Sequence, residues 1–307
     1  MTSLADMIAA EAARRTFPAA DAFAQHLVTQ YGPSTAAVVF YGSCLRTGSD
    51  QGGMLDFYVL VDRMGDAIKH PLSALAGAVL PPNVYYRELP FEGRVLRAKV
   101  AVMTMAAFIV GASPGLWASK IWASTIWARF AQPSAILYAR NDIIRGRVVA
   151  ALADAVKVMI AAAVPLMPDT FSARDLWVRA LQETYGAELR PESPAKAAEL
   201  VDADAARYGV VTDAVLGQPV DGRHKRVTAT TAAAARMHWR LRRVVGKSLN
   251  VLRLIKAAFT FQGGLDYAVW KIERHSGAKI ELTDADRRRP LVTGIKLLAR
   301  TWRKGGV

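Results

Sequence analysis

Two short apolar runs, residues 36–41 and 54–61, constrain the fold of this chain more than any other feature. The second run is apolar at every position except Asp56 near its start, so it does not show the alternation of a half-exposed strand. Such a strand must be covered on both faces, which is typical of a sheet packed between helices. Residues 84–89 and 94–103 predict two more strands, joined by a hairpin turn at "PFEG". We therefore expect an α/β or α+β fold.

The turn after the first strand has the composition of a phosphate-binding corner. Ser43, in the Gly42-Ser43 turn, lies 13 positions before Asp56 on the second strand. Glycine allows a backbone to approach a ligand closely, and the amides and hydroxyl of such a turn can hold phosphate oxygens. A carboxylate on the adjacent strand can hold Mg²⁺. Together these residues indicate a site for a nucleoside triphosphate and its metal ion.

This corner resembles the nucleotidyltransferase superfamily of the DNA polymerase β type, whose fold is a mixed sheet with helices. Most members carry a second acid two residues after the first, where this chain has Tyr58. Asp62 cannot replace that acid, because six strand residues put it roughly 20 Å from Asp56. Either one metal ion completed by substrate phosphates suffices, or the enzyme is inactive.

A narrower resemblance explains the missing acid. The segments "YGSCLRTGSDQGGMLDFYVLVD" and "PPNVYYRELPFEGRVLRAKVAV" are similar to the mitochondrial-type CDP-diacylglycerol synthases, which are phosphatidate cytidylyltransferases of the translocator assembly and maintenance family. That family has an aromatic residue where Tyr58 stands. The chain departs from its pattern at Cys44, at Arg87 and in a shortened spacer before Asp56. The matching positions are Tyr41, Gly42, Ser43, Met54, Asp56, Phe57, Asp62, Asn83, Tyr86 and Lys99.

Two helical segments extend the resemblance to about residue 215. "WARFAQPSAIL" matches the family at Arg129 and Pro133, and "TYGAELR" matches it at Tyr185 and Arg190.

The resemblance implies a reaction and a role for each residue. CTP and phosphatidic acid would give CDP-diacylglycerol and pyrophosphate, with Mg²⁺ as cofactor. Asp56 would bind the metal ion, and Asp56 and Lys99 would be the catalytic residues. The expected nucleotide-binding residues are Tyr41, Gly42, Ser43, Asn83, Tyr86 and Arg129. The candidates for holding the lipid phosphate, or for supporting the residues that do, are Tyr58, Tyr185 and Arg190.

The positive charge of the chain is concentrated at one end. The 307 residues carry a net charge of +14, but residues 1–222 hold 20 Lys and Arg against 21 Asp and Glu. Residues 223–307 hold 20 Lys and Arg against 5 Asp and Glu. Basic residues beside an apolar helical face are typical of attachment to an anionic membrane surface. The side chains expected to insert there are Trp239, Phe259, Phe261, Trp270 and Trp302.

The chain is expected to form three parts. Residues 1–115 would be the nucleotidyltransferase domain, residues 116–222 a helical domain with a winged helix as one candidate form, and residues 223–307 a basic amphipathic membrane-associating region. The uncharged window 100–119 is long enough to span a bilayer, and no other stretch comes close. Gly111, Pro114 and Gly115 interrupt it, so we interpret it as a buried strand followed by the start of a helix.

Location and competing functions complete the prediction. A single cysteine, Cys44, fits a reducing compartment, and residues 1–17 lack a targeting pattern. We therefore expect a cytoplasmic protein bound peripherally to the inner face of a bacterial membrane. Two alternatives remain open: a nucleotidyltransferase acting on RNA or protein, and an inactive membrane or nucleic-acid adaptor. Nucleic acid is the less favoured partner because no RNA-binding motif is present, and the oligomeric state is not predicted.

Overall fold

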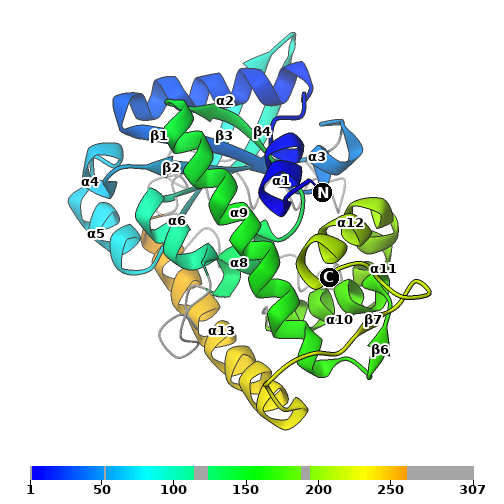
Figure 1. Ribbon diagram of the computed structural model, residues 1–307. Helices are drawn as coiled ribbons and strands as arrows, with labels where there is room; N and C mark the ends of the chain where they lie inside the picture. Colours follow the sequence, from blue (N-terminus) through cyan, green and yellow to red (C-terminus); the bar gives the residue numbers. More distant parts are fainter. Residues whose placement is uncertain (1, 52, 114–123, 188–193, 261–307) are drawn as a thin grey trace, which may run out of the picture.

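A five-stranded mixed sheet organises the protein in a computed structural model that describes residues 2–51, 53–113, 124–187 and 194–260 (Figure 1). The strand order is β3-β4-β2-β1-β5. β1 runs antiparallel to both β2 and β5, β2 runs parallel to β4, and β3 and β4 form an antiparallel hairpin. The strands are β1 (Thr35–Tyr41), β2 (Leu55–Val61), β3 (Asn83–Phe91), β4 (Arg94–Thr104) and β5 (Ser134–Ala139). The expected α/β fold with a mixed sheet is therefore confirmed.

The strand predictions succeeded for four of the five strands. Glu92 and Gly93 form the turn between β3 and β4, both with positive φ, as expected for the hairpin at "PFEG". β5 was missed, because a six-residue apolar run has no periodicity that separates a strand from a helix. Since β5 pairs with β1, the sheet extends beyond residue 115, where the first domain was expected to end.

Helices cover both faces of the sheet. On one face, Phe23 of α2 (Pro18–Tyr31) stacks on Phe57 of β2 with ring centroids 5.5 Å apart. On the other face, α9 (Asp142–Ala163) crosses the strands and packs against β1 and β5 (Figure 1). This double coverage explains why β2 is apolar on both sides. Among the described residues, the other α-helices near the sheet are α1 (Leu4–Ala12), α3 (Ser43–Thr47), α4 (Met64–Ala67), α5 (Pro71–Val79), α6 (Met105–Ala112) and α8 (Ser124–Phe130).

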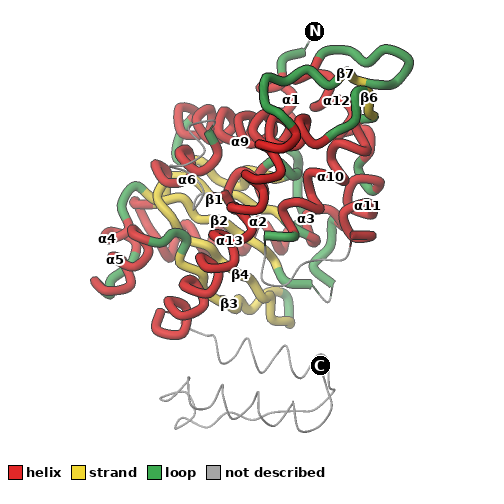
Figure 2. Tube along the Cα trace, turned by 90° about the horizontal axis from the view of Figure 1, so that it is seen from below, coloured by secondary structure: helices red, strands yellow, loops and turns green. Residues whose placement is uncertain are grey.

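A helical group continues from the far end of α9. It lies at the opposite end of the molecule from α5 in both views (Figure 1, Figure 2). Two short strands of two residues each flank this group in the sequence and pair with each other: β6 (Thr170–Phe171) and β7 (His224–Lys225). Its hydrophobic residues are continuous with the core on the α9 side of the sheet. The helices of this group are α10 (Ala173–Tyr185), α11 (Pro194–Asp202) and α12 (Ala205–Leu216).

The window at residues 100–119 is described as far as residue 113, and there it is a strand followed by a helix, as expected. A different segment, Asp142–Leu166, is long and apolar enough to span a membrane by length and composition alone. The expectation that no stretch besides residues 100–119 comes close to a membrane span is therefore wrong. Of its most apolar stretch, 67% is buried inside the protein. Because α9 is covered by α1, α6, α8 and α10, it has the surroundings of a core helix.

The long helix α13 (Ala232–Thr260) forms most of the described part of the basic region, which begins with β7. Its inner face carries Trp239, which is only 1% exposed and donates a hydrogen bond from Nε1 to the carbonyl of Ala162 at 3.0 Å. The prediction that Trp239 inserts into a membrane is therefore wrong. An apolar pattern alone does not tell which side of a helix the protein covers. Phe261, Trp270 and Trp302 lie outside the described residues, as does the side chain of Phe259.

We predict that Trp239→Phe lowers the free energy of unfolding by about 1–3 kcal/mol, because the buried Ala162 carbonyl loses its donor. Urea denaturation of the full chain measures this change. Met237→Ala on the same helix is the matched control, because Met237 is 64% exposed; we expect it to change stability by less than about 0.5 kcal/mol. Equal effects of the two substitutions would contradict the buried position of Trp239.

Candidate functional site

A row of paired residues crosses the sheet and gathers four of the predicted site residues. Tyr41 on β1 pairs with Asp56 on β2, Asp56 pairs with Lys99 on β4, and Lys99 pairs with Tyr86 on β3. Side chains of paired residues on neighbouring strands lie on the same face of a sheet. The structure therefore brings the two predicted catalytic residues, Asp56 and Lys99, side by side between two tyrosines.

Gly42 brings the turn after β1 against the carboxylate of Asp56. Its φ of 92° lies in the region that favours glycine, and a Cβ at this position would be 2.6 Å from Asp56 Oδ2. No other residue can take this conformation without displacing the carboxylate. Ser43, the next residue and the first of α3, is exposed. The expected close approach of the Gly42-Ser43 turn is present.

Two opposing effects act on the pKa of Asp56. Burial raises the pKa of this carboxyl above its ordinary value, while the positive charges of Lys99, Arg129 and Arg46 act in the opposite direction. The acid is therefore partly desolvated and has three cations around it. An anionic ligand with several charges would suit this environment better than a second carboxylate would.

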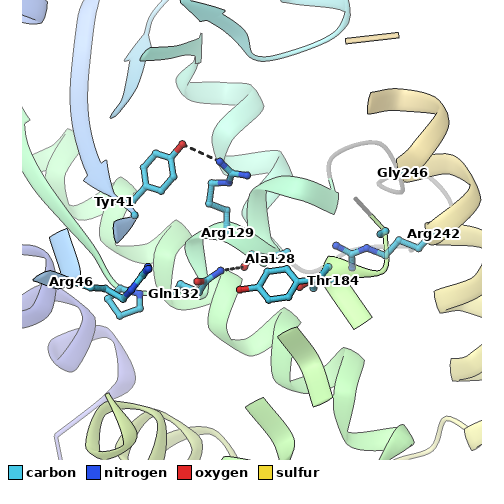
Figure 3. A pocket seen from close by; sticks show the side chains of 12 residues that line it. Tyr41, Arg46, Ala128, Arg129, Gln132, Thr184, Arg242 and Gly246 are labelled. Carbon is cyan, nitrogen blue, oxygen red and sulfur yellow. Dashed lines mark hydrogen bonds between the residues drawn. The ribbon is translucent and has the colours of Figure 1, made fainter. Parts of the chain in front are cut away.

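Arg129 of α8 links the sheet to the helices. Its guanidinium donates a hydrogen bond to the Tyr41 hydroxyl at 3.0 Å, and its central carbon lies 5.3 Å from the centroid of the Tyr41 ring (Figure 3). Burial raises the pKa of Tyr41, so this phenol remains neutral and accepts the bond. Tyr58, two residues after Asp56, is buried and packs on Tyr41 with ring centroids 5.4 Å apart. It supports Tyr41 from the core.

Tyr86 and Asn83 have different positions, although both were predicted to bind nucleotide. Tyr86 lies on the face of Lys99 and donates a hydrogen bond to Glu88 Oε1 at 2.6 Å. Asn83 is 1% exposed and donates to the carbonyl of Ser73 at 2.8 Å and to the Tyr85 hydroxyl at 3.3 Å. Because side chains alternate along β3, Asn83 points with Tyr85 to the opposite face. The structure does not bring Asn83 together with the other site residues.

A pocket adjoins the row at Tyr41 and Gly42 (Figure 3). Tyr185 at the end of α10 lines it, and its role near the lipid phosphate stays a prediction. Arg190 lies outside the described residues. The other lining residues are Arg46, Ala128, Arg129, Gln132, Pro133, Thr184, Ala187, Arg242 and Gly246.

Arg46, Gln132, Thr184, Arg242 and Gly246 were missed by the sequence analysis. For Arg242 a weak signal existed, because Trp239, Arg242 and Gly246 fall on one stripe of a helix. The sequence does not show which face of the helix packs against the protein, and only the structure shows that this stripe is the buried one.

A metal ion would find one protein carboxylate at this site. In the described parts of the chain, no three His, Cys, Asp or Glu side chains cluster in a way that could hold a metal ion. Asp62 follows the far end of β2 and forms a two-point ion pair with Arg140, at 2.6 and 3.0 Å. It is therefore engaged away from Asp56, as its distance along the strand predicted.

The comparisons with known proteins identify no family. No family model and no curated protein matches the sequence. Among solved structures, the chain is 14% identical to a nucleotidyltransferase-like protein from Exiguobacterium sibiricum, with a TM-score of 0.24 and coverage of 93% of this chain and 91% of that one. A similarity this weak does not establish a shared fold, so the site must be judged by its own geometry.

We predict that Asp56→Asn makes the protein more stable at neutral pH. The folded state binds the Asp56 proton more tightly than the unfolded state does, because the pKa is raised in the folded protein. The stability of the unsubstituted protein therefore falls as the pH rises from the ordinary aspartate pKa to the raised one, and stays lower above it. The asparagine variant lacks this loss, so its advantage should shrink as the pH is lowered.

Urea denaturation over a pH series measures the difference. Asp62→Asn is the opposing control, because the ion pair with Arg140 lowers the pKa of Asp62. This control should lose stability at neutral pH, by no more than about 1 kcal/mol for an exposed pair. A destabilised Asp56→Asn variant would contradict the described environment of Asp56.

Proposed function

We propose that the protein is a Mg²⁺-dependent nucleotidyltransferase that transfers CMP from CTP to phosphatidic acid, giving CDP-diacylglycerol and pyrophosphate. The observation that carries the proposal is the row Tyr41–Asp56–Lys99–Tyr86 with the Gly42 backbone against its acid. One carboxylate among several cations suits a substrate that carries both a metal ion and many negative charges. The choice of CTP and phosphatidic acid follows from the sequence resemblance.

The residues fit a magnesium ion that arrives with the nucleotide. Mg²⁺ is commonly held by one or two carboxylates together with substrate phosphates. Asp56 provides one such ligand, and Tyr58 is packed into the core where a second acid would stand. Bound there, the ion would neutralise charge on the triphosphate and help pyrophosphate to leave.

The roles of the side chains follow from their charge and position. Lys99, beside Asp56 on the sheet, would stabilise negative charge that develops on the transferring phosphate. Arg129 would bind a neighbouring phosphate oxygen while Tyr41 holds its guanidinium. Gly42 and Ser43 would contact the triphosphate through backbone amides and a hydroxyl. Tyr86 would border the site from β3.

The acceptor requires no general base in this reaction. An oxygen of the phosphatidate phosphate, already an anion near neutral pH, would attack the α-phosphorus of CTP. A new P–O bond forms while the bond to the bridging α–β oxygen breaks, and pyrophosphate leaves with that electron pair. Positioning and charge neutralisation are then the main contributions of the protein.

Contact with an anionic membrane would bring the lipid acceptor within reach. The outward face of α13 carries five apolar side chains that are 45–65% exposed, and the exposed Arg236, Arg240 and Lys247 lie among them. Such a face suits peripheral binding to the inner surface of a bacterial membrane by a cytoplasmic protein. The five apolar residues, named here the α13 stripe, are Met237, Leu241, Val244, Val251 and Leu252.

We expect Asp56→Ala to lower CDP-diacylglycerol formation by on the order of 100-fold or more. The reason is that the Mg²⁺ that arrives with CTP would lose its carboxylate ligand from the protein. The assay follows label from CTP into lipid with phosphatidic acid micelles and Mg²⁺. Asp66→Ala, at an exposed position on α4, is the matched control and should retain full activity. Absence of product from the folded unsubstituted protein would refute the proposal and favour an RNA or protein acceptor or an inactive adaptor.

Membrane contact through the α13 stripe makes a separate prediction. The double variant Leu241→Asp, Val244→Asp should reduce flotation with phosphatidic acid-containing vesicles by at least about tenfold, because it removes apolar area and adds negative charge. Binding of the unsubstituted protein should weaken with added salt. Ile143→Asp, at a 75% exposed apolar position on α9, is the control and should float normally. Unchanged flotation of the double variant would exclude α13 as the membrane contact.

A further inference from the structure

The pocket beside the row has a strongly positive lining that the transfer reaction at Asp56 does not by itself explain. Its twelve lining residues include Arg46, Arg129 and Arg242, and none of the twelve is acidic. They come from β1, α3, α8, α10 and α13 and from the loops next to these elements, which are distant in the sequence. Figure 3 shows Arg46 and Arg242 on opposite sides of the pocket with Arg129 between them. Three guanidinium groups around one hollow select for an anion.

Arg242 is held firmly in this pocket. It is 3% exposed, and its guanidinium carbon lies 3.6 Å from the ring centroid of Trp127 and 4.8 Å from that of Trp239. Stacking on aromatic rings uses the faces of a guanidinium, whereas its hydrogen bonds lie in its own plane. The two tryptophan rings, which are inclined to each other by 71°, therefore hold the guanidinium in place from two sides.

Beside Arg242, α13 closely approaches the end of α10 and the residues that follow it. Gly246, one turn after Arg242, also lines the pocket, and a Cβ there would be 2.9 Å from the carbonyl oxygen of Ala187. An ion pair of 3.1 Å between Arg243 and Glu183 joins the same two helices. α13 thus approaches Ala187, just after α10, more closely than a larger residue at position 246 would allow, and Arg242 lines the pocket one turn before this contact.

We propose that the pocket binds a phosphate group of a substrate, with Arg46, Arg129 and Arg242 as its donors. Planar guanidinium groups match phosphate oxygens in pairs, and several of them together favour a group with two negative charges over a carboxylate. The pocket reaches Asp56 through Gly42 and Arg129, so the bound phosphate would lie next to the reacting centre, which rests on the proposed function. Two sources share this chemistry: the phosphomonoester of the acceptor, and the terminal phosphates of the nucleotide.

Calorimetric binding to the full chain tests the proposal with three probes: inorganic pyrophosphate, CTP with Mg²⁺, and a short-chain phosphatidic acid below its micelle concentration. Loss of one guanidinium–phosphate contact should weaken binding by about 10- to 100-fold. We therefore expect Arg242→Leu to weaken at least one probe to this degree. Arg147→Leu, at an exposed position on α9, is the matched control and should bind all three normally.

The variants and probes make each outcome informative. Arg46→Ala changes an exposed side chain, so it provides the same test if Arg242→Leu fails to fold. If only the binding of phosphatidic acid weakens, the pocket belongs to the acceptor. If only the binding of CTP weakens, it belongs to the nucleotide. If a variant binds pyrophosphate more weakly and the unsubstituted protein has no transferase activity, the phosphate pocket is supported and the proposed reaction is refuted. Unchanged affinity for all three probes in both folded variants would overturn the pocket assignment.

Discussion

The register of the central strands is the constraint on which the rest of the site depends. β2 is covered on both faces, so its side chains alternate between two separate cores, one under α2 and one under α9. A slip of one residue would exchange the two sets and place Asp56 in the α2 core. The pairing of Tyr41, Asp56 and Lys99 is therefore maintained by the apolar residues that precede Tyr41 on β1 and follow Asp56 on β2 and Lys99 on β4.

Positive charge reaches this row from several layers of the structure. Lys99 comes from the sheet, Arg46 from the turn after it, Arg129 from a helix above it and Arg242 from α13. Placing like charges close together costs free energy, which a bound phosphate would offset. The aromatic side chains of Tyr41, Trp127 and Trp239 reduce that cost without adding negative charge, because the face of a ring attracts a cation.

α13 connects the site with the outer surface. Its inner face carries Trp239, Arg242 and Gly246 against the protein, and further along it Lys256 donates to the carbonyls of Leu80 and Pro82. Its outer face is the exposed α13 stripe. Its inner side thus carries buried cations beside Trp239, and its outer side combines the exposed apolar stripe with Arg236, Arg240 and Lys247. A partner on the outside would therefore sit directly over a helix that also forms the phosphate pocket.

The sequence by itself determined the strands that carry the site and which residues on them are candidates for its chemistry. Apolar runs and strand-forming residues indicated β1 to β4. The Gly42-Ser43 turn and Asp56 were found from their composition and spacing, and Lys99 was found from the resemblance to a known family. Because side chains alternate along a strand, the sequence could also have shown that Asn83 and Tyr86 lie on opposite faces of β3. Only the tertiary structure decided that residues 134–139 join the sheet, that Trp239 is buried, and that Arg242 enters a pocket with Arg46 and Arg129. Local patterns report which residues share a strand or helix face, but the element that covers that face is set by packing between segments far apart in the chain.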